Sequence, residues 1–242
     1  MTTLIVSDVH LGSSYNRVKD LTYFVKSLDF GRLIILGDLF DRPDLSRLKE
    51  EEWNFLKLLN MIGEYKDVIW VEGNHDEKLK NSIPSMFNIS AVKEFSWSSN
   101  GKNLLALHGH QFDDYTRQKN YLASFASHVY KCLRSVDLML NRDIFHPICY
   151  GNKSWQRLSE IVNERALEYA KKKNADFVFC GHTHRATNVA KDGVQYFNTG
   201  CWKDRYCHYV LIEDYYVSLN KFDKPIKSEH TNAPRLRLRH AV

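Results

Sequence analysis

Five short groups of aspartate, histidine and asparagine residues recur along this chain of 242 residues, and each group directly follows an apolar run. The apolar runs are residues 4–6, 33–36, 68–71, 104–107 and 177–180, and their composition predicts strands. The groups that follow them are Asp8 and His10; Asp38 and Asp41; Asn74, His75 and Asp76; His108 and His110; and His182 and His184. Because strands of one sheet end along a common edge, these side chains are expected to converge there. Carboxylate, imidazole and amide groups are ligands of divalent transition metals, so the sequence predicts a metal centre.

Two of the groups place their polar residues two positions apart. Asp8 and His10 have this spacing, and so do His182 and His184. In an extended stretch that leaves a strand, residues two apart point the same way, as chelating ligands must. The alternative for the first pair is that Asp8 caps a turn and His10 is an ordinary loop histidine.

The group after the second run offers two carboxylates. A carboxylate has two oxygens, so Asp38 is a candidate to bridge two metal ions. Asp41, three residues later, is expected to orient a ligand or a basic neighbour. The alternative is that an aspartate here caps the next helix.

The group after the third run is more specific. Gly73 lets the backbone turn sharply off the strand, and Asn74 offers a neutral carbonyl oxygen to a metal. His75 is then placed beside the metal rather than on it. Asp76 is expected to hold the His75 ring and to raise its pKa, as carboxylate–histidine pairs do. A surface turn is the alternative.

Together the groups supply seven candidate metal ligands, which are too many for one ion. They are Asp8, His10, Asp38, Asn74, His108, His182 and His184. Two ions bridged by Asp38 accommodate them, and mixed nitrogen and oxygen ligands favour Mn, Fe, Zn or Ni over Mg or Ca. Two ions suit phosphoester hydrolysis, with His75 and Asp76 as the candidate catalytic residues. His110 is expected to lie behind the ligands or in a loop.

The elements between the groups predict an α/β fold. Helical patterns at 20–28 and 45–62 separate the first strands, which indicates βαβ units, and Asn100-Gly101 indicates a hairpin between 95–98 and 104–107. Helical patterns from 115 to about 139 and from about 154 to 173 follow, and residues 115–153 are predicted to be a helical insertion. Strands are expected at 194–198, 206–213 and 215–221. We predict one domain over residues 1–222 and a basic tail over 223–242.

Composition restricts the setting. The chain begins without a signal-peptide pattern, and no apolar stretch approaches the ~20 residues of a spanning helix. The five cysteines are odd in number and contain no CxxC, which favours a reducing cytoplasm over a disulfide framework. The net charge of +5 owes much to the tail. That tail is either a solvated terminus or a patch for an anionic membrane or nucleic acid. The expected location is cytoplasmic, with peripheral contact with the inner membrane as an alternative.

The ordered set DxH, GDxxD, GNHD, HGH and GHTH resembles the calcineurin-like metallophosphoesterases, over about residues 1–220. The resemblance implies a four-layer α/β/β/α sandwich and attack by a metal-bridging hydroxide. It also implies one ion held by Asp8, His10, Asp38 and His184. The second ion would be held by Asp38, Asn74, His108 and His182.

Within that family the chain is most similar to the UDP-2,3-diacylglucosamine pyrophosphohydrolase group of lipid A biosynthesis. The chain is similar to that group in its total length, in residues 108–113, in the helical insertion that follows them and in residues 198–202. Established members of that group carry arginine where this chain has His75. The expected substrate is a nucleotide- or lipid-linked diphosphate, with the insertion either an apolar lid or ordinary helix packing. The alternatives are a general phosphodiesterase or nuclease, for which basic and aromatic residues alternate at 202–206, and a non-catalytic metal-bound scaffold.

Overall fold

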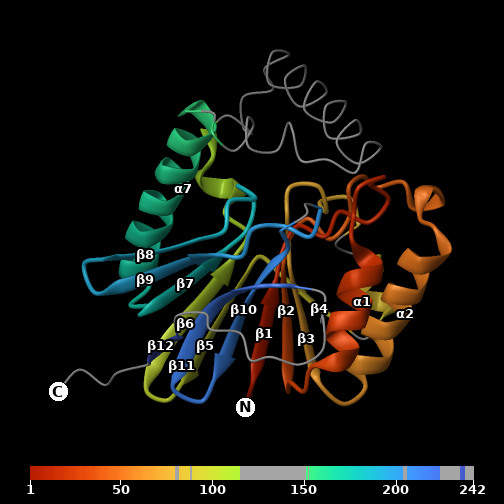
Figure 1. Cartoon of the computed structure of the whole chain (residues 1–242), viewed down its shortest axis with the longest axis horizontal. Coiled ribbons are helices and arrows are strands. Elements are labelled where there is room, and N and C mark those ends of the chain that lie inside the picture. Colours follow the sequence, from red (N-terminus) through yellow and green to blue (C-terminus); the bar gives the residue numbers. More distant parts are fainter. Residues whose placement is uncertain are drawn as a thin grey trace.

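The computed structural model describes residues 1–79, 82–87, 89–114, 151, 153–203, 206–223 and 235–237. Over these residues the strands form two sheets that pack face to face, with helices on both outer sides (Figure 1). The helices and strands of the two sheets follow the βαβ and hairpin patterns that the sequence predicts.

The first sheet has the strand order β12-β11-β10-β1-β2-β3-β4. Its parallel strands are β1 (Thr3–Val6), β2 (Arg32–Leu36), β3 (Asp67–Val71) and β4 (Ser90–Val92). Its antiparallel strands are β10 (His208–Glu213), β11 (Tyr216–Lys221) and β12 (Arg235–Arg237). Helix α1 (Val18–Ser27) joins β1 to β2, and helix α2 (Glu50–Gly63) joins β2 to β3. The predicted βαβ units are confirmed.

The second sheet has the order β5-β6-β7-β9-β8. Its strands are β5 (Glu94–Ser99), β6 (Lys102–Leu107), β7 (Phe177–Cys180), β8 (Thr187–Lys191) and β9 (Val194–Asn198). Strands β6, β7 and β9 are parallel. The hairpin between β5 and β6 turns at Asn100 and Gly101, whose φ angles of 50° and 73° are those of the tight turn expected for this pair. Helix α7 (Lys153–Lys172) packs on β7 and β9.

Side-chain alternation along the strands divides the core into three layers. On β1, Leu4 and Val6 pack with α1 and α2, whereas Ile5 faces the second sheet. On β6, Leu105 and Leu107 pack with α7. Each sheet is therefore apolar on both faces, which explains why its central strands read as continuous apolar runs. The predicted four-layer α/β/β/α arrangement is confirmed.

The structure differs from the sequence pattern in several elements. The predicted helix 45–62 is a short 3-10 turn, η1 (Leu45–Arg47), followed by α2. The Asp44 side chain accepts the Ser46 backbone N–H at 3.1 Å and caps the start of the turn. The backbone is extended at Leu48, which separates the turn from α2. Strands β4, β8 and β12 were not predicted, because each is short or largely exposed. Most of the predicted insertion, residues 115–150 and 152, lies outside the described residues, as does most of the tail.

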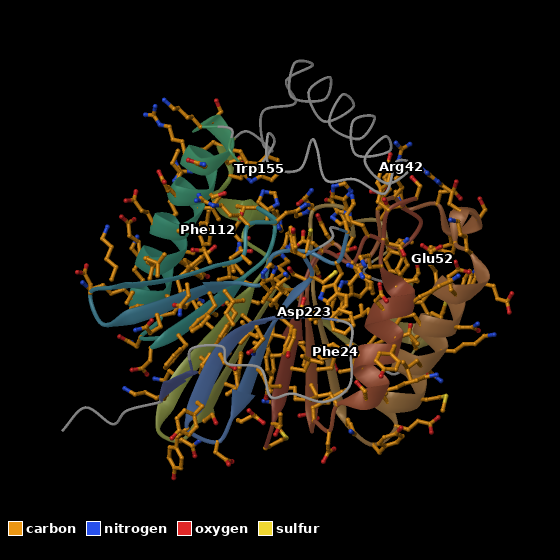
Figure 2. All side chains as sticks on the ribbon, in the orientation of Figure 1. Phe24, Arg42, Glu52, Phe112, Trp155 and Asp223 are labelled. Carbon is orange, nitrogen blue, oxygen red and sulfur yellow. The ribbon has the colours of Figure 1, made fainter. Side chains whose placement is uncertain are left out.

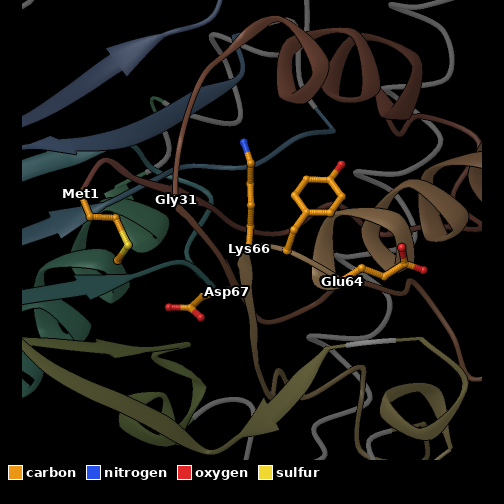
Figure 3. A pocket seen from close by; sticks show the side chains of 7 residues that line it. Met1, Gly31, Glu64, Lys66 and Asp67 are labelled. Atoms are coloured by element: carbon orange, nitrogen blue, oxygen red, sulfur yellow. The ribbon is translucent and has the colours of Figure 1, made fainter.

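The two ends of the parallel strands differ in chemistry. The starting ends border a shallow hollow of about 450 Å³, shown in Figure 3. Its lining residues are Met1, Gly31, Gly63, Glu64, Tyr65, Lys66 and Asp67. Four of the predicted ligands, Asp8, His10, Asp38 and Asn74, follow the opposite ends of the same strands. Among the helices of the described residues, none has the length and apolar character needed to cross a membrane.

Candidate metal centre

The five polar groups converge at the carboxyl ends of β1, β2, β3, β6 and β7. Among the described residues, three overlapping clusters each keep their ligand atoms within 4.8 Å of one another. The clusters are Asp8, His10 and His184; His10, Asp38 and His75; and Asp8, Asp38 and His108. Residues from both sheets therefore meet at one place, as the strand-end pattern predicts.

The first cluster brings three ligand atoms close together. Nε2 of His184 lies 3.1 Å from Oδ1 of Asp8 and 3.3 Å from Nε2 of His10. Burial and then the charge of Lys203 lower the pKa of His10 to about 3, so its imidazole is neutral. Burial alone would raise the pKa of Asp8, but His184 and His10 hold it well below its ordinary value. A neutral imidazole beside an ionised carboxylate is a suitable site for a cation.

Asp38 lies between the clusters. Its Oδ2 is 3.9 Å from Nε2 of His10, 3.8 Å from Nε2 of His75 and 3.5 Å from Nε2 of His108. Its Oδ1 accepts the His75 backbone N–H at 3.0 Å, which fixes the carboxylate plane. Burial opposes ionisation, but His108, His75 and His10 hold the pKa of Asp38 well below its ordinary value. One carboxylate oxygen thus faces rings from both sheets.

Buried polar atoms without partners mark the second part of the centre. Nδ1 of His108 donates to the Leu36 carbonyl at 2.6 Å, which leaves Nε2 facing Asp38. Nε2 of His108 and Oδ1 of Asn74 are both buried and make no hydrogen bond within the described chain. Leaving such atoms unsatisfied costs about 1–3 kcal/mol each, and a bound cation would satisfy both. The residues present therefore fit a divalent metal.

The charge on His108 also depends on the neighbouring carboxylates. Burial would lower its pKa, but the charges of Asp38 and Asp8 outweigh burial and raise that pKa to about 9 in the metal-free protein. To hold a metal ion, His108 would have to release the proton on Nε2, as ligand sites require.

His182 stands apart from the three clusters. Its ring centroid is 5.2 Å from that of His108, and its backbone N–H donates to Oδ2 of Asp8 at 3.0 Å. Its Nε2 lies 2.9 Å from Oδ2 of Asp113, so Nδ1 is the ring atom that remains as a candidate ligand. Asp113 is buried and was not among the predicted site residues, although it ends the 108–113 segment quoted for the family resemblance.

The local backbone is not extended, as the two-residue spacing had suggested. Asp8, His10, Asp38, His182 and His184 all have φ between 48° and 66°, in the left-handed region. That region costs side-chain-bearing residues of order 1–3 kcal/mol each and persists only where the surroundings impose it. Here the loops constrain one another: the His10 N–H donates to the Asp38 carbonyl at 2.9 Å, and the Trp202 N–H donates to the Asp8 carbonyl at 3.1 Å.

Two glycines allow these loops to approach closely. A Cβ on Gly73 would lie 2.2 Å from the backbone nitrogen and Oδ1 of Asp38. A Cβ on Gly181 would lie 2.4 Å from Oδ2 of Asp8. Gly73 has no left-handed φ, so its role is close approach to the bridging carboxylate rather than the sharp turn predicted from sequence.

The predicted contact between Asp76 and the His75 ring is wrong. Nδ1 of His75 lies 2.7 Å from the Asp41 carbonyl, which orients the ring. The fully buried Asp76 carboxylate instead accepts hydrogen bonds from four donors at 3.0–3.3 Å. These donors are the backbone N–H groups of Leu39, Phe40 and Gly73 and the Trp70 indole. Asp76 therefore ties the loops after β2 and β3 together, because backbone donors outnumber any side-chain partner there.

The Asp41 carboxylate lies near one predicted ligand and two basic neighbours. Its Oδ1 lies 3.6 Å from Nδ1 of His10 and 3.5 Å from Nζ of Lys203, and its Oδ2 lies 3.8 Å from Nε of Arg42. Sequence reasoning assigned Lys203 only to the 202–206 run of the nuclease alternative and not to the metal centre, because it lies far along the chain from Asp41.

The 198–202 segment has a bracing role. The buried Asn198 side-chain amide donates to the Gly181 carbonyl at 2.6 Å and to the Thr183 and Tyr196 hydroxyls at 3.1 Å. These bonds hold the loop that carries His182 and His184. His110 lies beside the ligand His108, with the two ring centroids 5.3 Å apart.

Comparison with known structures shows the same fold elsewhere. Vacuolar protein sorting 29 from Cryptosporidium parvum is 12% identical with a TM-score of 0.55, covering 98% of this chain and 97% of that one. Wild-type Vps29 from Entamoeba histolytica, complexed with Zn²⁺, is 12% identical with a TM-score of 0.51, covering 99% and 100%. Vps29 from Chaetomium thermophilum is 13% identical with a TM-score of 0.51, covering 98% and 93%.

Sequence comparison decides the family. No curated protein matches the chain. Residues 1–186 match the calcineurin-like phosphoesterase family, and this region contains every predicted metal ligand. The chain belongs to the calcineurin-like phosphoesterase family and is a metal-dependent phosphohydrolase.

Proposed function

We propose that this chain hydrolyses a phosphoester or pyrophosphate bond at a centre of two divalent ions, with manganese preferred. One ion would be held by Asp8, His10, Asp38 and His184, and the other by Asp38, Asn74, His108 and His182. The observation that carries the proposal is the position of Asp38 Oδ2, 3.5–3.9 Å from three imidazole nitrogens contributed by both sheets. When bound, two such ions supply Lewis-acid activation of the phosphoryl group and a hydroxide nucleophile at neutral pH.

His75 is the residue that we propose to act on the leaving group. Its side chain is 36% exposed, unlike the buried ligands around it. Nδ1 donates to the Asp41 carbonyl, so Nε2 is the atom free to carry a second proton towards a departing oxygen. General acids of this kind contribute typically ~10²–10⁴-fold to the rate.

The favoured substrate class is a nucleotide- or lipid-linked diphosphate, such as that of the UDP-2,3-diacylglucosamine pyrophosphohydrolase group. Two cations support this choice, because Lys203 and Arg42 flank Asp41 beside the centre and suit a substrate with a second phosphate. Figure 2 shows Arg42 and Trp155 on the strand-end side of the molecule, and the Trp155 ring centroid is 6.4 Å from that of His184. The predicted insertion at 115–153, whether lid or ordinary helix packing, lies almost wholly outside the described residues and carries none of this argument.

A general phosphodiesterase, including a nuclease, is the second candidate, and His75 favours it. An alkoxide leaving group needs a proton, whereas the phosphate released from a diphosphate needs one much less. An exposed imidazole at this position therefore suits a diester substrate better than a diphosphate. Contact of the basic tail with an anionic membrane or nucleic acid stays a prediction.

The test is an activity panel on the Mn-loaded protein. The substrates are UDP-2,3-diacylglucosamine, nucleotide pyrophosphates, bis-p-nitrophenyl phosphate and single-stranded DNA. Each is measured with wild type, Lys203→Met and the control Lys26→Met, which alters an exposed lysine of α1. For a diphosphatase, Lys203→Met is expected to raise KM about tenfold for diphosphates, the loss of one charge-assisted contact, and to leave the chromogenic diester unchanged.

Three results would change the proposal. Turnover of DNA or the diester far above that of any diphosphate would favour the second candidate. An equal effect of Lys203→Met on all substrates would show that Lys203 does not bind the second phosphate of a diphosphate. Full metal loading without hydrolysis of any substrate would leave the scaffold alternative.

A further inference from the structure

One buried carboxylate close to the centre belongs to none of the predicted ligand groups. Oδ2 of Asp113 lies 2.9 Å from Nε2 of His182, and both side chains are nearly buried, at 5% and 11% exposure. An ionised carboxylate only accepts hydrogen bonds, so the imidazole is the donor. This contact fixes the His182 tautomer with its proton on Nε2.

We infer that Asp113 is a positioning residue for the second metal ion and acts through His182. The inference rests on the proposed two-ion function. A metal-binding histidine commonly donates its other N–H to a carboxylate, which fixes the ring and strengthens it as a ligand. With Nε2 held by Asp113, the lone pair of His182 is on Nδ1, the atom available to an ion. The His182 N–H to Asp8 Oδ2 bond, at 3.0 Å, fixes the backbone at the same residue.

The element that carries Asp113 is rigidly attached to the second sheet. Asp113 follows the 3-10 turn η2 (His110–Phe112), and its own N–H donates to the His110 carbonyl at 3.1 Å. Nη1 of Arg165, on α7, donates to the Phe112 carbonyl at 2.7 Å, and the Phe112 ring packs 5.6 Å from that of Tyr169. Figure 2 shows Phe112 against α7. The carboxylate is therefore held by a helix rather than by a free loop.

Asp113 and Asp41, the carboxylate near His10, differ in how closely they approach their histidines. Asp41 lies 3.6 Å from Nδ1 of His10 and is shared with Lys203 and Arg42. Asp113 approaches His182 more closely, and through the opposite ring nitrogen. Removing it should release the ring of His182 and affect the second ion while leaving the first ion in place.

The experiment measures Mn²⁺ binding to chelator-treated full-length protein by calorimetry, in wild type, Asp113→Ala, Asp113→Asn and the control Asp114→Asn. Asp114 is the neighbouring carboxylate, is 59% exposed and pairs with Nη2 of Arg165 at 2.7 Å, a contact that the amide oxygen of Asn can keep as a hydrogen bond. Asp113→Ala is expected to weaken one of the two binding events 10–100-fold, the range for groups that support a ligand, and to leave the other unchanged. Asp113→Asn keeps an oxygen that accepts the Nε2 proton and should recover much of that loss. Asp114→Asn should resemble wild type.

A second measurement reads the tautomer directly. Ring ¹⁵N shifts of metal-free protein, with His182 assigned by comparison with His182→Gln, should show the proton on Nε2 in wild type and a mixture in Asp113→Ala. The inference is overturned if the tautomer is the same in both, or if Asp113→Ala weakens both ions equally and Asp113→Asn restores nothing. If wild type binds only one ion, the proposed two-ion function fails, while the tautomer measurement still decides the role of Asp113.

Discussion

The two sheets hold their metal-ligating side chains by different means. The first ligand set comprises the loops after β1, β2 and β3, which carry Asp8, His10, Asp38, Asn74 and His75. The second ligand set comprises the loops after β6 and β7, which carry His108, His182 and His184.

Backbone groups connect the loops of the first ligand set. The His10 N–H donates to the Asp38 carbonyl, the His75 N–H donates to the Asp38 carboxylate, and Asp76 accepts the Leu39 and Phe40 N–H groups. Each loop therefore fixes the next, and a change in one is expected to disturb all three.

The two loops of the second ligand set share one backbone bond, from the Gly181 N–H to the His108 carbonyl, and side-chain contacts orient their histidine rings. His108 donates to the Leu36 carbonyl, His182 contacts Asp113, and Asn198 braces the Gly181 carbonyl. Substitutions there are expected to affect one ligand at a time. We infer from this comparison that metal binding by the first set depends on the three loops folding together. Metal binding by the second set depends on side-chain contacts that orient each histidine.

Asp38→Ala is expected to have the largest effect. It removes the carboxylate that faces rings of both sets, so both ions and all measurable activity should be lost. Metal analysis after mild purification, with activity on a diester, checks this. Asp29→Ala, at a fully exposed carboxylate, is the control and should retain metal. Full metal loading of Asp38→Ala would show that Asp38 does not bridge two ions.

His75→Ala separates chemistry from metal binding within the first set. Its metal content should be unchanged, while kcat should fall ~10²–10⁴-fold on substrates with poor leaving groups, the usual contribution of a general acid. The loss should be smaller for p-nitrophenyl esters, whose leaving group departs without a proton. Equal losses on both classes would show that His75 acts by positioning or charge instead.

Asp76→Ala tests the structural coupling of the first set. The substitution leaves four buried donors without an acceptor, and each costs about 1–3 kcal/mol, so the free energy of unfolding should fall by at least about 4 kcal/mol. Asp113→Ala removes the contact with His182 in the second set and should cost about 1–2 kcal/mol. Urea unfolding of the metal-free proteins measures both, and similar losses would contradict the difference between the sets.

The pH dependence of metal-free protein reports on the second set. The pKa of His108 is raised from 6.5 to about 9 by the Asp38 and Asp8 charges, against the effect of burial. A histidine whose pKa is higher in the folded state stabilises the fold fully below pH 6.5, and that contribution is lost as the pH rises through 9.

Its size is on the order of 3 kcal/mol, from about 1.4 kcal/mol per pKa unit. Urea unfolding at pH 7 and pH 9.5 should show this loss in wild type, and His108→Gln should show a flatter profile. The pKa values of Asp8 and Asp38 are lowered, so their contributions are lost only below about pH 4 and do not affect this window. A wild-type profile as flat as that of His108→Gln would show that the His108–Asp38 interaction does not stabilise the fold.

Much of the site follows from sequence, because strand ends are local features. An apolar run followed by polar residues marks where a side chain leaves a sheet, and five such runs place Asp8, Asp38, Asn74, His108 and His182 at one edge. Residue type then fixes the chemistry, since carboxylate and imidazole together indicate a transition metal. The βαβ units and the Asn100-Gly101 hairpin are also local patterns.

Only the tertiary structure decided which group orients which ligand. The Asp113–His182 contact joins residues 69 positions apart, and the Asp41 carbonyl reaches His75 over 34 positions. Asp76 is adjacent to His75 in sequence, yet it turns to the backbone of another loop. Left-handed φ at Asp8 and His182 likewise depends on neighbouring loops that impose it. No local periodicity encodes these partners, because hydrogen bonds between separate loops form only when the sheets bring the loops together.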